Sequence, residues 1–302
     1  MTFRYFIALG FRLNHWRWMI LKKFEYVKPS TLEEMADILQ QYGDGAKILN
    51  GGTDLLVRMR DNLVKPKVVV DIKGISEMKK LELTEEGLFI GAAVTMNEVI
   101  CSNIVLEKYR ILAEAAHEVG SYQLRNRATI AGNVCNASPS GDTIAPLYVL
   151  SAKVKIYSKD GIRVVPIEDF IQGVRKIDLK PAEIVMGISL PSIEGKNGGS
   201  YYKHARRKDV DLATVGVAAF RNEGRWKIAY AAVAPTILRG HKAEAILNDL
   251  KEISEDTLGP AMDAAASEVT PISDVRAGRE YRLDMIRISL KRSVLAALMQ
   301  YQ

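Results

Sequence analysis

The 302 residues are enough for two or more domains with separate hydrophobic cores, and 48% hydrophobic with 26% charged residues is an ordinary globular composition. The net charge is +6, and the basic residues are mixed with acidic residues along the whole chain. This mixture favours a solvated surface over a nucleic-acid-binding tract. The two cysteines, Cys101 and Cys135, have no metal-binding spacing, so we expect no zinc or iron–sulfur site in this chain and reduced thiols in a cytoplasmic protein. No apolar run approaches the ~20 residues that span a bilayer.

The first 18 residues differ in character from the rest of the chain. They are aromatic and basic, and Arg12, His15 and Arg17 interrupt their apolar run, which is not typical of a secretory leader. We expect residues 1–18 to be a poorly ordered extension, with a partner-docking arm as the alternative. The globular pattern begins near Phe24.

The part of the chain up to about residue 192 alternates short helices with short strands. A capping box of Ser30 and Glu33 predicts a helix that Gly43 ends. Periodicity predicts further helices at residues 54–59, from Thr95, at 105–119 ended by Gly120, and at 143–150. Strands are predicted at residues 46–49, 67–72, 81–83, 88–91, 154–157, 162–165 and 183–190, several of them paired as hairpins.

The glycine-bearing run at residues 192–200 predicts a domain boundary, after which the pattern changes. Strands are predicted at residues 201–205, 213–220 and 226–234, and helices at 240–250, 257–269 and 278–299. This order predicts an antiparallel sheet covered by helices, so the chain as a whole is expected to be an α+β protein. We find no internal repeat.

Two segments bring small residues to the end of an extended run. Gly51 and Gly52 follow the strand at 46–49, and Gly132 lies in the segment 129–133, which is predicted as a second turn. Neither segment matches a Walker A loop or a dinucleotide-binding Rossmann turn, and a tight turn alone would explain Gly51 and Gly52. The pair together, followed by Asp142 at the start of a predicted helix, predicts one site for a pyrophosphate and sugar hydroxyls.

No nucleophile and base stand together in the sequence. The four histidines, His15, His117, His204 and His241, are scattered, and no G-x-S-x-G elbow is present. We therefore expect the chemistry to come from a bound cofactor that the protein positions, and we name no catalytic residue and no metal ligand.

Four segments, in this order along the chain, resemble the FAD-binding medium subunits of the molybdenum hydroxylases, the family of xanthine dehydrogenase and aerobic carbon monoxide dehydrogenase. They are residues 49–56, 124–133, 138–142 and 202–207. The resemblance extends from about Met19 to the end. It implies an FAD-binding domain of the PCMH/VAO-like type over residues 19–192, with two lobes divided near residue 81, and a C-terminal flavoprotein domain over residues 200–302.

The resemblance also implies which residues hold FAD. Two loops would surround its pyrophosphate, Asp142 would contact the ribityl chain or nearby polar atoms, and Asp209 would lie in a loop that controls access of the electron acceptor. Ala131 stands where many relatives have a glycine, so its φ should be negative. The implied cofactor-binding residues are Ile48, Leu49, Asn50, Gly51, Gly52, Thr53, Asp54, Leu55, Val119, Thr129, Ile130, Ala131, Gly132, Asn133, Asp142, Val185 and Lys203.

The function implied is electron transfer within a heterotrimer. A small iron–sulfur subunit with [2Fe–2S] clusters and a large subunit with the molybdopterin cofactor would be the partners, and FAD would pass electrons to an acceptor such as NAD. The alternatives are a free-standing FAD-dependent oxidoreductase resembling the enolpyruvyl-sugar-nucleotide reductase, and a non-catalytic nucleotide-binding module. No nucleic acid and no membrane span are expected.

Overall fold

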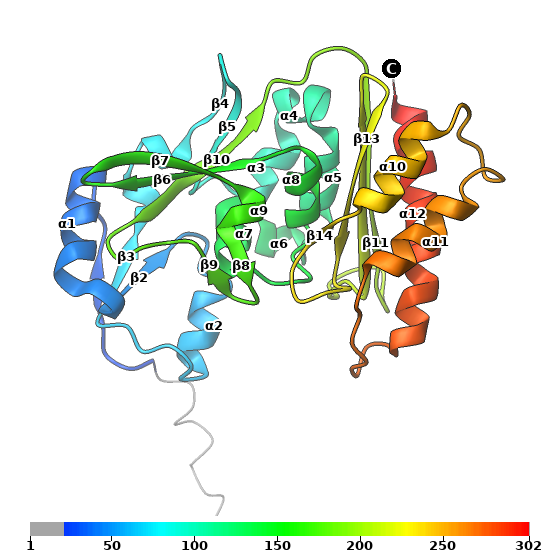
Figure 1. Ribbon diagram of the computed structural model, residues 1–302. Helices are drawn as coiled ribbons and strands as arrows, with labels where there is room; N and C mark the ends of the chain where they lie inside the picture. Colours follow the sequence, from blue (N-terminus) through cyan, green and yellow to red (C-terminus); the bar gives the residue numbers. More distant parts are fainter. Residues whose placement is uncertain (1–20, 302) are drawn as a thin grey trace, which may run out of the picture.

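The computed structural model describes residues 21–301. The prediction of a poorly ordered extension at residues 1–18 lies outside the described residues. The described part of the chain contains three main sheets and twelve α-helices, as expected of an α+β protein. Figure 1 shows their arrangement.

The first sheet is small and parallel. Its strands are β1 (Glu25–Val27), β2 (Ala46–Leu49) and β3 (Val68–Asp71), with the fully buried β3 in the centre. Helix α1 (Leu32–Tyr42) connects β1 to β2, and α2 (Leu55–Arg60) follows β2. The N-cap of α1 is Thr31, whose side chain accepts a hydrogen bond from the Glu34 backbone N–H, so the predicted capping residues are displaced by one position.

The second sheet is antiparallel and has five strands in the order β4-β5-β10-β6-β7. These strands are β4 (Leu81–Thr84), β5 (Gly87–Gly91), β6 (Lys153–Ser158), β7 (Gly161–Pro166) and β10 (Ile184–Pro191). Between β5 and β6 lie the helices α3 (Met96–Cys101), α4 (Asn103–Lys108), α5 (Arg110–His117), α6 (Tyr122–Arg125), α7 (Ile130–Asn136) and α8 (Ile144–Val149). A short segment after β7 holds α9 (Ile167–Phe170), β8 (Ile171–Gly173) and β9 (Lys176–Ile177).

The prediction of one long helix at residues 105–119 is wrong, because the helix is interrupted between α4 and α5. Tyr109 has φ −126° and ψ 35° at the break and is completely buried. Its hydroxyl donates a hydrogen bond to the Pro191 carbonyl at 2.9 Å. The helix therefore ends where this aromatic side chain turns into the core and reaches the end of β10.

The third sheet is antiparallel, with strands β11 (Asn197–His204), β12 (Val215–Asn222), β13 (Arg225–Ala231) and β14 (Leu238–Arg239). Helices α10 (His241–Asp249), α11 (Gly259–Glu268) and α12 (Arg279–Gln300) lie on its outer side, while α5 and α8 pack on the other (Figure 1). Strand β11 already starts at Asn197, inside the run predicted as a linker.

Both faces of the third sheet are buried, and its inner face belongs to the same hydrophobic core as residues 32–190. Tyr201, Phe220 and Ala229 are members of that core together with Ile111 and Leu147 of α5 and α8. The outer face forms a second core with α10–α12. The inner face thus fixes the C-terminal sheet against the helices that carry the candidate site.

A candidate cofactor-binding pocket

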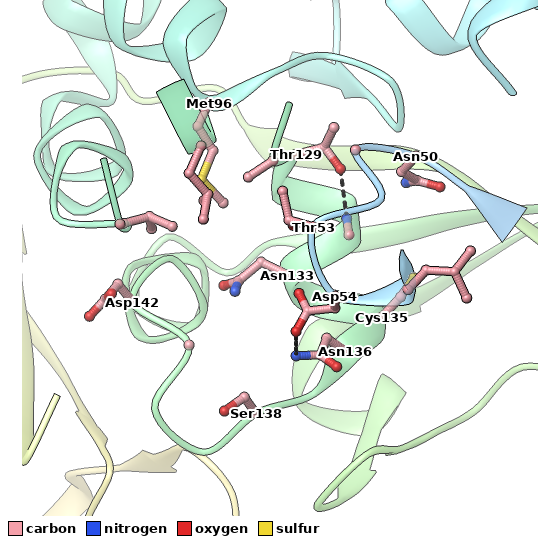
Figure 2. A pocket seen from close by; sticks show the side chains of 18 of the residues that line it. Asn50, Thr53, Asp54, Met96, Thr129, Asn133, Cys135, Asn136, Ser138 and Asp142 are labelled. Carbon is pink, nitrogen blue, oxygen red and sulfur yellow. Dashed lines mark hydrogen bonds between the residues drawn. The ribbon is translucent and has the colours of Figure 1, made fainter. Parts of the chain in front are cut away.

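A pocket of about 800 Å³ opens where segments from all parts of the fold meet. Its wall is formed by the turn between β2 and α2, the start of α7, the segment before α8, strand β10 and the loop between β11 and β12. Figure 2 shows polar side chains from the turn between β2 and α2, from α7 and from the segment before α8 around the pocket, including Asn133 and Asp142. The volume falls within the range of small-molecule and cofactor sites.

The first glycine segment is held tightly against the protein. Gly52 has φ +79°, a conformation that strains other residues. A Cβ on Gly51 would lie 1.9 Å from the Arg127 carbonyl oxygen, so this glycine lets two backbones approach each other. Its missing side chain makes room for the segment that leads into α7, while the approach of a phosphate to this turn stays a prediction.

The backbone N–H groups of this turn are open. Within residues 21–301, no group accepts a hydrogen bond from the backbone N–H of Gly51, Gly52, Thr53 or Asp54. No side chain caps the start of α2 either. Consecutive open N–H groups on a glycine-bearing turn form a concave site that favours an anion.

The second glycine segment is not a turn, and this prediction is wrong. Thr129 is the N-cap of α7, and its Oγ1 accepts a hydrogen bond from the Gly132 N–H at 2.9 Å. Ala131 lies in the first turn of the helix, where φ is negative, and is 99% buried. The alanine fits because helical backbone needs no glycine there. Ile130 and Ala131 point into the core instead of the pocket.

The asparagine side chains expected at the cofactor partly hold the frame of the pocket. The Asn50 amide donates a hydrogen bond to the Ala92 carbonyl at 3.1 Å, and the Asn133 carbonyl accepts one from the Thr143 hydroxyl at 2.7 Å. Asn136 donates a hydrogen bond to the Asp54 carboxylate at 3.2 Å, which ties α7 to the first glycine segment (Figure 2). These bonds fix the two segments relative to each other.

Asp142 lies at the end of the pocket nearest the C-terminal sheet and is held by two side chains of β11. Its Oδ1 accepts a hydrogen bond from the Tyr201 hydroxyl at 2.9 Å, and its Oδ2 pairs with Lys203 Nζ at 2.8 Å. Lys203 Nζ also donates to the Glu118 carbonyl at 2.9 Å. Burial raises the pKa of Asp142 to about 6, against the opposing effect of Lys203 and Tyr201.

Most of the residues expected at the cofactor line this one pocket. They are Ile48, Asn50, Gly51, Gly52, Thr53, Asp54, Leu55, Val119, Thr129, Gly132, Asn133, Asp142 and Val185. Four others are not part of its wall: Leu49, Ile130, Ala131 and Lys203. Lys203 lies behind Asp142, with its side chain 6% exposed, so it reaches the pocket through that carboxylate.

Several lining residues were missed by the sequence analysis. Apolar side chains come from Met96 and from Ile177 and Leu179 near the short β8–β9 hairpin, whose two- and three-residue strands carry no clear periodic signal. Arg58 also lines the pocket, and its Nε is buried without a hydrogen-bond partner. Its position four residues after Asp54, on the same face of α2, is a signal that the sequence did contain.

The loop between β11 and β12 forms another part of the wall. Asp209, expected in this loop, does not line the pocket, whereas Val210 and Asp211 do. Asp211 pairs with Arg206 at 3.3 Å, and Arg207 donates a hydrogen bond to the Val210 carbonyl at 2.8 Å. Val210 has φ +50°, an unfavourable conformation for a β-branched residue, so the loop is held in a strained form.

Comparison with known proteins identifies the family. Residues 22–193 match the FAD binding domain in molybdopterin dehydrogenase, and residues 200–297 match the CO dehydrogenase flavoprotein C-terminal domain. The chain belongs to the FAD-binding medium subunits of the molybdenum hydroxylases. FAD is therefore the cofactor of this family member, and its α+β architecture is that of the family.

The relatives match this family member over nearly its whole length. It is 31% identical to the xanthine dehydrogenase FAD-binding subunit of Escherichia coli O157:H7, over 91% of this chain and 97% of that protein. It is 32% identical to the carbon monoxide dehydrogenase medium chain of Hydrogenophaga pseudoflava, over 92% and 98% of the two chains. A solved structure of carbon monoxide dehydrogenase from the same organism superposes with a TM-score of 0.88 at 32% identity, covering 94% of this chain and all of that one.

Two further observations concern the described residues alone. No helix in residues 21–301 is long and apolar enough to cross a membrane. The two cysteines are free thiols, and burial raises the pKa of Cys135, in the wall of the pocket, to about 12.

Proposed function

We propose that this chain holds FAD in the pocket described above and passes electrons through it within a molybdenum hydroxylase complex. The observation that carries the proposal is the run of open backbone N–H groups at Gly51 to Asp54 beside a largely apolar pocket. A pyrophosphate bound there would accept the hydrogen bonds that the protein leaves unmade.

The donor set fits a dinucleotide in further respects. The apolar part of the wall, including Val119 and Val185, suits an aromatic ring system, and the buried Asp142 carboxylate suits the hydroxyls of a sugar alcohol. Arg58 adds a positive charge to the wall. When bound, FAD supplies chemistry that accepts electrons singly and delivers them in pairs.

The residues of this chain act by binding and positioning. The turn at Gly51 to Asp54 would fix the phosphates, and Thr129 fixes the start of α7, whose residue Gly132 lies at the pocket. The loop with Asp211 forms part of the pocket wall, and we assign it the role of limiting the access of water and of an electron acceptor.

The complex that we propose is a cytoplasmic heterotrimer. A small subunit would deliver electrons from [2Fe–2S] clusters, and a large subunit would hold the molybdopterin cofactor. An acceptor such as NAD would take up the electrons from FAD. The names of the relatives support this, since several are called FAD-binding subunits or medium chains of dehydrogenases. Free thiols at Cys101 and Cys135 accord with a reducing compartment.

The test is to purify the chain alone and together with its genomic neighbours, and to record visible absorption, metal content and NAD reduction. We expect a flavin spectrum in the chain alone. With a reducing substrate such as xanthine or carbon monoxide added as the electron donor, we expect NAD reduction only in a complex that contains molybdenum and iron. A chain that takes up no FAD on titration contradicts the cofactor site. Flavin-dependent turnover by the chain alone contradicts the subunit role and favours a free-standing oxidoreductase.

A further inference from the structure

Arg58 is a cation in the wall of the pocket that the protein itself does not neutralise. Its Nε is buried and has no hydrogen-bond partner, and no carboxylate in residues 21–301 lies within ion-pair distance of its guanidinium. Leaving a buried donor unpaired is unfavourable, and more so for a charged group. Such a group calls for a partner that the chain does not supply.

The natural partner within the chain is kept away. Asp54 is four residues before Arg58, the spacing at which opposite charges meet on a helix. The Asp54 carboxylate instead accepts a hydrogen bond from Asn136 at 3.2 Å, across the gap to α7. This carboxylate is therefore paired with the asparagine and not with Arg58.

The position of Arg58 on α2 also directs its side chain. Side chains on a helix lean towards its N-terminus and cover the preceding turn. For Arg58 this turn holds Asp54 and Leu55, and Asp54 is the last residue of the Gly51 to Asp54 segment, whose backbone N–H groups are open. Arg58 and this segment line the same pocket.

The other cations of the wall are less suited to this role. Arg207 donates to the Val210 carbonyl and lies near Asp211, and Arg175 is exposed. A phosphate partner would satisfy the buried Nε of Arg58 with a charge-assisted hydrogen bond, the kind that arginine makes best.

We propose that Arg58 donates a hydrogen bond from Nε to a pyrophosphate oxygen of the bound dinucleotide and so completes the anion site of the first glycine segment. This inference rests on the proposed FAD pocket. It assigns the recognition of the phosphates to one side chain in addition to the backbone.

The experiment uses the full chain after removal of flavin, with FAD titrated by fluorescence quenching and ADP as a competitor. The variants are Arg58→Gln, Arg58→Lys and, as a matched control, Arg60→Gln. Arg60 has the same side chain on the same helix, is exposed and pairs with its neighbour Asp61. We expect Arg58→Gln to lower the affinity for FAD and for ADP by the same factor, about tenfold to a hundredfold. The affinity should fall less in Arg58→Lys and stay unchanged in Arg60→Gln.

The outcomes separate this proposal from the proposed function. Wild-type protein that binds neither ligand overturns both. Wild-type protein that binds FAD while Arg58→Gln binds it equally well overturns the role of Arg58 alone. A loss for FAD without a loss for ADP also overturns it, because the contact then lies on the flavin side. If Arg58→Gln does not fold, Arg58→Lys decides, and an FAD affinity equal to that of wild type contradicts the proposal.

Discussion

Gly51 shows how a single residue without a side chain can hold two distant segments together. We expect Gly51→Ala to lower the free energy of unfolding by about 3 kcal/mol, because its Cβ would meet the Arg127 carbonyl at 1.9 Å and the two backbones must separate. The same displacement should weaken FAD binding. Thermal unfolding and FAD titration measure the two effects.

The control for this substitution is Gly259→Ala. Gly259 lies in the first turn of α11, and a Cβ there meets nothing within 4 Å. We expect its stability and FAD affinity to be unchanged or slightly raised. A Gly51→Ala protein with the stability of wild type would contradict the close approach seen in the structure.

Asp142 is expected to make stability depend on pH. Its pKa rises from the ordinary 3.8 to about 6 on folding, because it is buried. Between these values the folded chain holds a proton that the unfolded chain has lost, so this contribution is complete below pH 3.8 and disappears as the pH rises through 6. The shift corresponds to a contribution on the order of 3 kcal/mol.

The measurement compares the melting temperature of wild type with that of Asp142→Asn from pH 4 to pH 7. Asparagine cannot titrate, so wild type should lose stability relative to the variant as the pH rises. Two curves that run parallel over this range would show that Asp142 has an ordinary pKa in the folded chain.

At the scale of elements, the sequence predicted the helices and strands that carry their own local signals. The hairpin of β6 and β7 and the helices around the C-terminal sheet follow from alternation, turn residues and helical periodicity. The start of α7 was missed although Thr129 is a good N-cap, because Gly132 was interpreted as a turn residue. The break at Tyr109 depends on a contact with Pro191, which local sequence does not encode.

Most of the residues predicted at the cofactor line the pocket, but the sequence did not show how they act. The pairing of Asp142 with Lys203 joins residues 61 positions apart, so spacing gives no hint that the lysine supports the carboxylate from behind. Arg58 was missed for a related reason: its lack of a partner becomes visible only when the side chains around it are placed.

Strand β11 is expected to hold the pocket wall through Lys203. Lys203→Met leaves the buried Asp142 with one donor fewer and should lower the free energy of unfolding by about 3–5 kcal/mol, as expected when one partner of a buried ion pair is removed. FAD affinity should fall with it, since Asp142 lines the pocket. Chemical denaturation and flavin titration check both.

A double-mutant cycle of Lys203→Met with Asp142→Asn distinguishes the loss of this ion pair from a general destabilisation of β11. The double variant should lose less than the sum of the two single losses, because the two side chains interact. Lys208→Met, an exposed lysine in the following loop, is the control and should behave as wild type. Strictly additive losses would mean that Lys203 does not act through Asp142.

At the scale of the whole molecule, the C-terminal sheet shares a core with the part that carries the glycine segments. We therefore expect the apoprotein to unfold in one cooperative transition, although two family domains match the chain. Calorimetry tests this by comparing the calorimetric with the van't Hoff enthalpy, which should agree. FAD at a hundred times its Kd should stabilise the whole transition by about 2.7 kcal/mol. Two separate transitions, of which FAD shifts only one, would contradict the common core.

The support of Asp142 by β11 also has a consequence for the order of events during protein synthesis. Both glycine segments leave the ribosome well before Tyr201 and Lys203, the two side chains that hold Asp142. A nascent chain that ends ahead of β11 has the open N–H groups but lacks the supports of that carboxylate. Flavin loading should therefore follow translation of the C-terminal sheet, and ribosome-bound chains shorter than about 200 residues should carry no flavin.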